Sequence, residues 1–261
     1  MLLSIIIPVY NRQEGLNKLL GSLGGQIQQC ILDKDVEVII IDDFSLVPVN
    51  ISGTAMEVSV ERNGENSGAP FSRSRGFQRS KGKFIHFHDS DDSISEQWLS
   101  EVLDELKSFP SIDILMTGRV DVDKYDETLR FQKYFHKHVN HPDKIKSRLV
   151  YRNCMGPLGG VVFSRRILES INFKPFLSCQ DWQMYIDAVE NAKVLRSRPD
   201  IHFIFNKTGD DRISHDARKK ILGHSQLAKI TAPKSPFKKS IRLFYLYTCK
   251  QHVFNKGGLI L

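Results

Sequence analysis

Residues 84–93 read FIHFHDSDDS, a short apolar run that ends in three carboxylates, Asp89, Asp91 and Asp92. An apolar run of this length, bounded by polar residues, predicts a buried strand. Like charges held close together repel and raise one another's pKa, so a folded chain keeps such a cluster where a cation binds or where water screens it. The rest of the sequence decides which fold surrounds this strand and which explanation applies.

Similar short apolar runs recur on both sides of this stretch, and helix-compatible segments separate them. The alternation of strand and helix predicts an α/β fold with a mostly parallel central sheet and helices on both faces. We expect the helix after the acidic cluster to begin behind Ser93 or Ser95, because either hydroxyl could cap it. The expected strands are 2–9, 36–42, 55–61, 83–89, 112–118, 160–164 and 201–205, and the expected helices are 14–23, 70–82, 94–109, 165–171 and 181–192.

The order weakens between residues 120 and 160, which are polar, aromatic and rich in turn residues. We expect a mobile or binding segment there instead of more regular sheet. The chain therefore divides into one domain over residues 1–230, with halves at 1–120 and 121–230, and an extension over 231–261. That extension is basic and amphipathic, so it fits either an anionic membrane surface or a solvated helix packed on its own domain.

Composition excludes several classes of protein. Four widely spaced cysteines without a CxxC pair argue against a zinc site and a disulfide framework. No run approaches the about 20 apolar residues that span a bilayer, and the first residues lack a basic leader. These features predict a cytoplasmic protein, either free or peripheral on the cytoplasmic face of the inner membrane. The net charge of +7 would suit nucleic acid, but an acidic cluster at the site repels phosphate, so we expect no nucleic-acid partner.

Polar residues gather where three expected strands end. The first strand ends at Pro8–Arg12, the second at Asp42 and Asp43, and the fourth at the acidic cluster. The carboxyl ends of parallel strands meet at one edge of a sheet, so these residues are predicted to share one site. Each feature alone has an ordinary structural explanation: a packed aromatic for Tyr10, a turn for Asp42 and Asp43, and an acidic helix N-terminus for the cluster.

The acidic cluster itself indicates a divalent cation. In an extended backbone Asp89 and Asp91 project to the same side, whereas Asp92 faces elsewhere. Two neighbouring carboxylates suit a hard ion such as Mg²⁺ or Mn²⁺, which needs few protein ligands when substrate phosphates complete its coordination. No GxGxxG follows the first strand, which argues against a dinucleotide-dependent oxidoreductase.

Four segments in order resemble the family 2 glycosyltransferases with the GT-A fold, a Rossmann-like nucleotide-diphospho-sugar transferase fold. These segments are SIIIPVYN at 4–11, VIIIDDFS at 38–45, NSGAPFSRSRGFQRSKGKFIHFHDSDD at 66–92, which ends in an Asp-x-Asp motif, and QDW at 180–182. The resemblance is strong over residues 2–120 and weaker over 155–215. Ser74 stands where the family commonly has Asn, and Gln180 stands where it commonly has an acidic residue.

The resemblance implies a UDP-sugar donor bound by the first half of the chain. Tyr10 would flank the uracil, Asp43 would accept its N3 hydrogen, and Arg73 would reach the diphosphate or hold the carboxylates. Asp91 is the expected metal ligand, assisted by Asp89, and the carboxylates are expected to stay unneutralised until the cation and the diphosphate bind. The full expected nucleotide-sugar set is Pro8, Val9, Tyr10, Asn11, Arg12, Asp42, Asp43, Asn66, Gly68, Arg73, Asp89, Ser90 and Asp91.

The resemblance also implies an inverting reaction in which Asp181 takes the proton from the acceptor hydroxyl. The ordinary alternative is that Asp181 only caps the helix that begins there. Trp182 and Gln180 are expected near the acceptor, and Lys207, Arg212 and His215 are expected in a late loop over the diphosphate.

The expected donor sugar is glucose, ahead of galactose and N-acetylhexosamines. The acceptor is expected to be a sugar on a lipid diphosphate, in O-antigen, lipopolysaccharide or capsule synthesis. The sequence leaves the oligomeric state undecided, and a homodimer is one of the states it allows. The competing interpretation is a relative that binds nucleotide sugars without catalysis.

Overall fold

One mixed sheet forms the centre of the protein. The computed structural model describes residues 1–32, 34–51, 58–123, 125, 127–132, 141–176, 178–206 and 217–230. The strand order is β3-β2-β1-β4-β8-β6-β9-β5, and β7 pairs with β6. The strands are β1 (Leu3–Val9), β2 (Val36–Asp42), β3 (Ser59–Arg62), β4 (Phe84–Phe87), β5 (Ser93–Ile94), β6 (Ile114–Val122), β7 (Thr128–Gln132), β8 (Val161–Ser164) and β9 (Leu195–Asn206).

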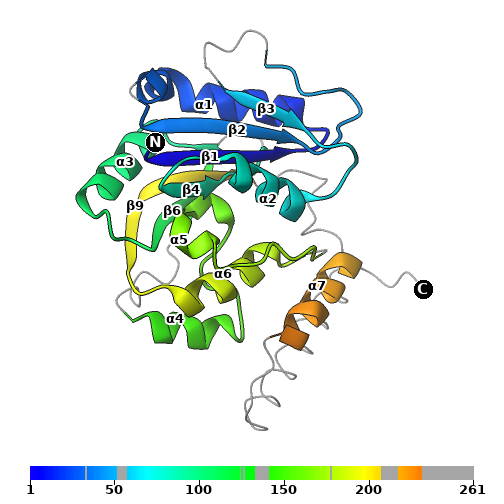
Figure 1. Cartoon of the computed structure of the whole chain (residues 1–261), viewed down its shortest axis with the longest axis vertical. Helices are drawn as coiled ribbons and strands as arrows, with labels where there is room; N and C mark the ends of the chain where they lie inside the picture. The colour runs from blue at the N-terminus through cyan, green and yellow to red at the C-terminus, as the bar shows by residue number, and fades with distance from the viewer. Residues whose placement is uncertain are drawn as a thin grey trace.

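Helices cover both faces of this sheet, as Figure 1 shows for α1 on one side and α4, α5 and α6 on the other. The helices are α1 (Gln13–Leu32), α2 (Ala69–Arg79), α3 (Trp98–Ser108), α4 (Pro142–Leu149), α5 (Arg165–Leu168), α6 (Gln180–Asn191) and α7 (Ala217–Ile230). Strand residues alternate between the two faces. Ile5 and Ile7 therefore pack with α1 and α3, whereas Ile6 packs in the second core with α5 and α6.

The first half of the sheet is parallel and the second half is mixed. β1 pairs in parallel with β2 and with β4, and β2 pairs in parallel with β3. β8 is antiparallel to both β4 and β6, whereas β6 and β9 are parallel. The predicted fold class, a Rossmann-like GT-A fold with a mostly parallel sheet, is confirmed. The antiparallel pairs of the described strands all involve β7, β8 or β9, which follow residue 120.

The strand before the acidic cluster is fully buried despite its two histidines. His86 Nδ1 lies 3.0 Å from the carbonyl oxygen of Val161, and His86 Nε2 lies 3.0 Å from His88 Nδ1. Burial lowers the pKa of His86 to about 3 and that of His88 to about 4, so both rings are neutral. Because a carbonyl only accepts, His86 donates to Val161 and His88 donates to His86. Three of the four ring nitrogens are thus paired inside the core, whereas the buried His88 Nε2 has no hydrogen-bond partner among the described residues.

Several element boundaries differ from the sequence-based expectation. α3 begins at Trp98, with Gln97 before it and no side-chain cap. Ser93 instead belongs to β5, which pairs with Ile204 and Phe203 of β9. A long-range strand pairing therefore replaces the local cap. The helix expected at 165–171 is short and ends at Leu168, whereas α1 extends to Leu32 with a kink at Gly24.

The expectation of irregular structure between residues 120 and 160 was wrong in part. β6 continues to Val122, β7 returns beside it, and α4 occupies Pro142–Leu149. These elements are amphipathic over short lengths only, which is why periodicity did not reveal them. No helix among the described residues is both long and apolar enough to cross a membrane. The basic extension at 231–261 lies outside the described residues.

Candidate active site

A tight turn follows β4 and brings the three carboxylates together. The backbone N–H of Asp92 donates to the carbonyl of Asp89 at 3.1 Å, which closes the turn. One ligand atom of each of Asp89, Asp91 and Asp92 lies within 4.8 Å of the others. The expectation that Asp92 faces elsewhere was therefore wrong, because it assumed an extended backbone. We call residues 89–92 the acidic turn.

Two arginines pair with the acidic turn. Arg12, after β1, contacts Asp91 at 2.8 Å, and Arg73 of α2 contacts Asp89 at 2.6 Å. The expectation that these carboxylates stay unneutralised until a ligand binds was wrong. Both arginines come from elements remote in sequence, so the acidic run alone gave no sign of them. Of the two expected roles of Arg73, holding a carboxylate is the one seen.

Two residues that sequence reasoning missed hold the acidic turn in place. A Cβ atom on Gly15, in the first turn of α1, would lie 2.5 Å from the carbonyl oxygen of Ser90, so only glycine allows this approach. Asn206, at the end of β9, donates its side-chain amide to the carbonyl of Asp91 at 2.8 Å and its backbone N–H to Asp92 at 3.2 Å. Ser90 and Asp92 are consequently buried.

The chemistry of the acidic turn fits a hard divalent cation. Its donors are carboxylate oxygens, which Mg²⁺ and Mn²⁺ prefer. The side chains of Asp89 and Asp91 are 36% and 23% exposed, so an ion could reach them from solvent. Asp92 is 2% exposed and accepts a hydrogen bond from Asn206, which suits a supporting role. Asp89 and Asp91 are thus the residues that would hold a cation.

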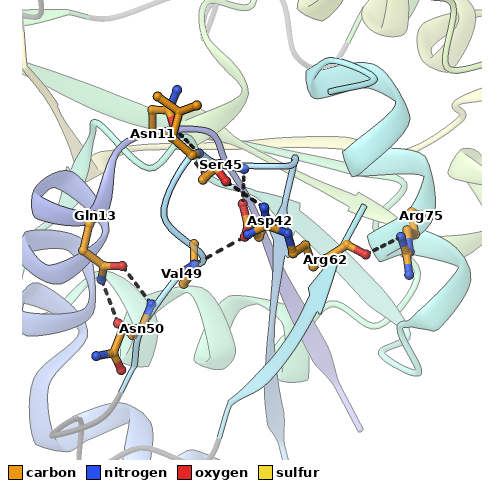
Figure 2. A network of polar contacts seen from close by, with 9 residues as sticks. Asn11, Gln13, Asp42, Ser45, Val49, Asn50, Arg62 and Arg75 are labelled. Atoms are coloured by element: carbon orange, nitrogen blue, oxygen red, sulfur yellow. Dashed lines mark hydrogen bonds and ion pairs between the residues drawn. The ribbon is translucent and has the colours of Figure 1, made fainter. Parts of the chain in front are cut away.

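Asp42, at the end of β2, organises the loop that follows it (Figure 2). Its carboxylate accepts the backbone N–H groups of Ser45 at 2.9 Å and Val49 at 3.3 Å, and pairs with Arg62 at 2.9 Å. Burial raises its pKa, but these hydrogen bonds and the Arg62 charge outweigh burial and leave the pKa below its ordinary value. Asp42 is 1% exposed and its carboxylate has a structural role in this loop, whereas its expected contact with the nucleotide stays a prediction.

Asp43, the next residue, holds the loop before α2. Its carboxylate accepts from the Asn63 side chain at 2.7 Å and from the backbone N–H groups of Ser67 at 3.0 Å and Gly68 at 2.7 Å. Gly68 has a φ of 83°, which favours glycine and explains its place in the motif. Asn63 is buried and was not predicted, whereas the predicted Asn66 is exposed.

The predicted residues at the end of β1 differ in their exposure to solvent. Pro8 and Val9 are buried within the strand, and Tyr10 is 44% exposed at its mouth. Asn11 has a φ of 51°, and its side chain accepts the backbone N–H of Leu46 at 2.7 Å. Tyr10 therefore offers an open ring face at the sheet edge where Asp43 and the acidic turn also lie.

Asp181, in the first turn of α6, lies near the acidic turn. Its carboxylate accepts from the Asn153 side chain at 2.9 Å and from the backbone N–H of Trp182 at 2.7 Å. Burial, assisted by the negative charge of Asp89, raises its pKa to about 6, although the hydrogen bonds and Arg73 oppose that rise. Sequence reasoning considered a neighbouring charge only at position 180, and it missed both the influence of Asp89 and the hydrogen bond from Asn153.

Arg73 links this helix to the acidic turn. Besides its ion pair with Asp89, it donates to the side-chain oxygen of Gln180 at 3.1 Å. Gln180 also donates to the carbonyl of Phe176 at 2.9 Å, so both ends of its amide are engaged. Trp182 is 5% exposed and donates to the carbonyl of Leu149, so it packs in the core, and its expected contact with the acceptor stays a prediction. The predicted loop residues Lys207, Arg212 and His215 lie outside the described residues.

Comparison with protein families identifies the family of this chain. The family described as "Glycosyl transferase family 2" matches residues 4–171, which include the acidic turn and the ends of β1 and β2. The chain belongs to glycosyl transferase family 2. The predicted family and the prediction of a transferase are thereby confirmed at the level of the family, whereas the O-antigen or capsule type is not.

Curated relatives of the chain include glycosyltransferases of several bacteria. An uncharacterized glycosyltransferase of Haemophilus influenzae is 36% identical over 115 residues, which are 44% of this chain and 37% of that protein. The poly(ribitol-phosphate) beta-N-acetylglucosaminyltransferase TarP of Staphylococcus aureus is 25% identical over 87% of this chain and 69% of its own. A poly(ribitol-phosphate) beta-glucosyltransferase of Bacillus spizizenii is 34% identical over 38% of this chain and 16% of its own.

Solved structures support the fold. Residues 1–349 of S. aureus TarS, crystallised with UDP-GlcNAc, superpose with a TM-score of 0.69 at 17% identity and cover 94% of this chain. This chain covers 70% of that structure. A likeness at this identity is evidence for the GT-A fold and carries no information about substrate.

Proposed function

We propose that the chain transfers a sugar from a UDP-sugar donor to an acceptor hydroxyl with inversion of the anomeric configuration. The observation that carries this proposal is the bridge made by Arg73. One guanidinium contacts Asp89 of the acidic turn and Gln180, the neighbour of Asp181. A donor diphosphate at the acidic turn and an acceptor at Asp181 would therefore be held side by side.

Asp181 is the proposed general base. A base works best when its pKa lies close to the working pH, and a pKa of about 6 leaves Asp181 ionised yet basic enough near neutrality. Asn153 holds one carboxylate oxygen and thereby orients the group. As the acceptor oxygen attacks the anomeric carbon, its proton passes to Asp181, and the bond to UDP breaks on the opposite face of the sugar.

Asp89 and Asp91 are proposed to hold a divalent cation, Mn²⁺ or Mg²⁺. When bound, such a cation stabilises negative charge on a leaving diphosphate. Arg12 and Arg73 share that electrostatic environment, because each already lies within 3 Å of a carboxylate of the turn. Tyr10 and Asp43 are proposed to contact the uracil, since both lie at the same strand ends.

The donor sugar and the acceptor are narrower parts of the proposal. Glucose remains the first candidate and N-acetylglucosamine follows closely, because the names of the relatives include a glucosyltransferase and an N-acetylglucosaminyltransferase. The acceptor is proposed to be a bacterial surface glycan or its lipid-diphosphate-linked precursor. Poly(ribitol phosphate) is a second acceptor to test, because two relatives are named for it.

The test of the base is Asp181→Asn. We expect kcat to fall by about 10²- to 10⁴-fold while UDP binding persists, because the amide cannot accept the proton. In the wild type, kcat should fall about tenfold per pH unit below pH 6. The measurement is UDP release from UDP-glucose and UDP-GlcNAc, with a lipid-diphosphate-linked sugar or poly(ribitol phosphate) as acceptor, at pH 4.5–9.

Asp187→Asn on the same helix is the matched control and should retain activity, because Asp187 pairs with Lys174 away from the acidic turn. Retained activity in Asp181→Asn would refute the base. No turnover by the wild type, with thermal stabilisation by UDP but not by GDP or CDP, would favour the non-catalytic alternative.

A further inference from the structure

Helix α7 rests directly on the turn that leads into the helix carrying Asp181. A Cβ atom on Gly223 would lie 2.2 Å from Ser178 Oγ and 2.6 Å from the Ser178 carbonyl oxygen, so there is no space for a methyl group. The Ser178 hydroxyl donates to the carbonyl of Lys219 at 3.1 Å, which ties the turn to α7. The contact thus requires glycine and is closed by a hydrogen bond.

His224, the next residue of α7, contacts residues that precede and follow the Gln180–Asp181 pair in the sequence. Its Nδ1 lies 3.6 Å from Cys179 Sγ, and its ring meets the Trp182 ring edge-on with centroids 5.8 Å apart. Cys179 and Trp182 flank the Gln180–Asp181 pair in the sequence. One side chain of α7 therefore packs against the residues immediately before and after that pair.

Cys179 has a backbone conformation that needs such support. Its φ is 60° and its ψ is 27°, a left-handed conformation that a residue other than glycine adopts only where its surroundings hold it. Its carbonyl accepts the N–H of Gln183 at 3.0 Å, so this residue opens the first turn of α6. Its side chain does not cap the helix. The direction in which α6 begins, and with it Asp181, depends on how Cys179 is held.

We propose that α7 positions Asp181, with Gly223 and His224 as positioning residues for the general base. This inference rests on the proposed role of Asp181 as the base. Gly15, Arg12 and Asn206 hold the acidic turn without α7, and Arg73 keeps its ion pair with Asp89 if its contact with Gln180 is lost. Displacement of α7 should therefore leave donor binding unchanged. The signature of a positioning role is therefore a loss of kcat at constant KM for the UDP-sugar.

The first experiment replaces His224. We expect His224→Ala to lower kcat by about 10- to 100-fold, as a small misplacement of a catalytic group does, with KM for the donor unchanged. His224→Asn, whose amide can occupy the place of Nδ1, should recover part of the loss. Ser225→Ala, at an exposed position of the same helix, is the matched control and should behave as the wild type.

The second experiment compares two glycines in helices. Gly223→Ala should push α7 from the turn, whereas Gly21→Ala in α1 has open space around its new methyl group. We expect only Gly223→Ala to lower kcat and to speed alkylation of Cys179 by iodoacetamide, with Cys30 as the internal reference. Mass spectrometry of the labelled peptides gives both rates without any assay of sugar transfer.

Unchanged kcat in His224→Ala and Gly223→Ala, while Asp181→Asn is inactive, would overturn the positioning role and leave the base intact. Equal alkylation rates in Gly223→Ala and the wild type would also overturn it. Activity retained by Asp181→Asn would instead refute Asp181 as the base, and measurements on the two α7 variants alone could not give that result.

Discussion

Two acidic pairs lie at the ends of β2 and β4, the two neighbours of β1, and have different environments. Asp42 and Asp43 follow β2, are nearly fully buried, and accept hydrogen bonds from the backbone of their own loops. Asp89 and Asp91 follow β4, are partly exposed, and face arginines from other elements. The carboxylates of the first pair are engaged within the protein, whereas those of the second pair are partly exposed to solvent. Identical side chains at equivalent ends of strands thus differ in exposure, because different hydrogen-bond donors surround them.

The largest difference between the pairs should appear in activity. Asp91→Asn removes a proposed cation ligand, so we expect kcat to fall by about 10²-fold or more, equivalent to several kcal/mol of transition-state stabilisation. Asp42→Asn should change kcat far less once the folded fraction is matched. Initial rates at 20 °C, with Mn²⁺ varied, measure both variants. Similar losses of activity in the two variants would erase the functional distinction between the pairs.

The loss of stability should be larger when Asp42 is replaced than when Asp91 is replaced. Asp42→Ala leaves the backbone N–H groups of Ser45 and Val49 without their acceptor in a buried site, which we expect to cost about 2–4 kcal/mol of unfolding free energy. Asp91→Ala removes one partly exposed ion pair, which is typically worth about 0–1 kcal/mol. Urea unfolding compares them. If Asp91→Ala proves the less stable variant, the assignment of Asp42 as structural fails.

The smallest expected effect concerns the arginine on the acidic turn. Arg12 shares the Asp91 carboxylate with any cation that binds there, so Arg12→Ala should tighten Mn²⁺ binding by about twofold to fivefold, equivalent to about 0.5–1 kcal/mol. The matched change, Arg62→Ala, removes the partner of Asp42 and should leave Mn²⁺ affinity unchanged. Calorimetric titration with Mn²⁺ in the presence of UDP checks both. Weaker binding in Arg12→Ala would show that Arg12 supports the ion instead of competing with it.

Much of the first half of the fold could be predicted because its signals are local. Continuous apolar runs predicted β1, β2 and β4, and the helix expected at 70–82 is present as α2, which ends three residues earlier, at Arg79. β7, α4 and the start of α3 could not be predicted in this way. β5 pairs with β9, more than 100 residues away, and no local pattern reveals such a partner.

The sequence indicated which residues to consider for the candidate site, but it did not reveal the contacts that these residues make. Asp89, Asp91, Arg73 and Asp181 were singled out, and the structure brings the first three together with Gln180 beside Asp181. Gly15, Asn153 and Asn206 were missed because each acts through a contact across the fold. Asp92 was misplaced because a turn, and not an extended strand, follows β4.

The sequence by itself determined the class of fold, the family and the identity of the acidic and basic residues at the strand ends, because periodicity and short motifs are properties of neighbouring residues. Only the tertiary structure decided which carboxylates are buried and which are exposed. A carboxylate's burial, partners and pKa depend on groups brought close by packing, and here those groups are arginines and backbone N–H groups distant in the chain.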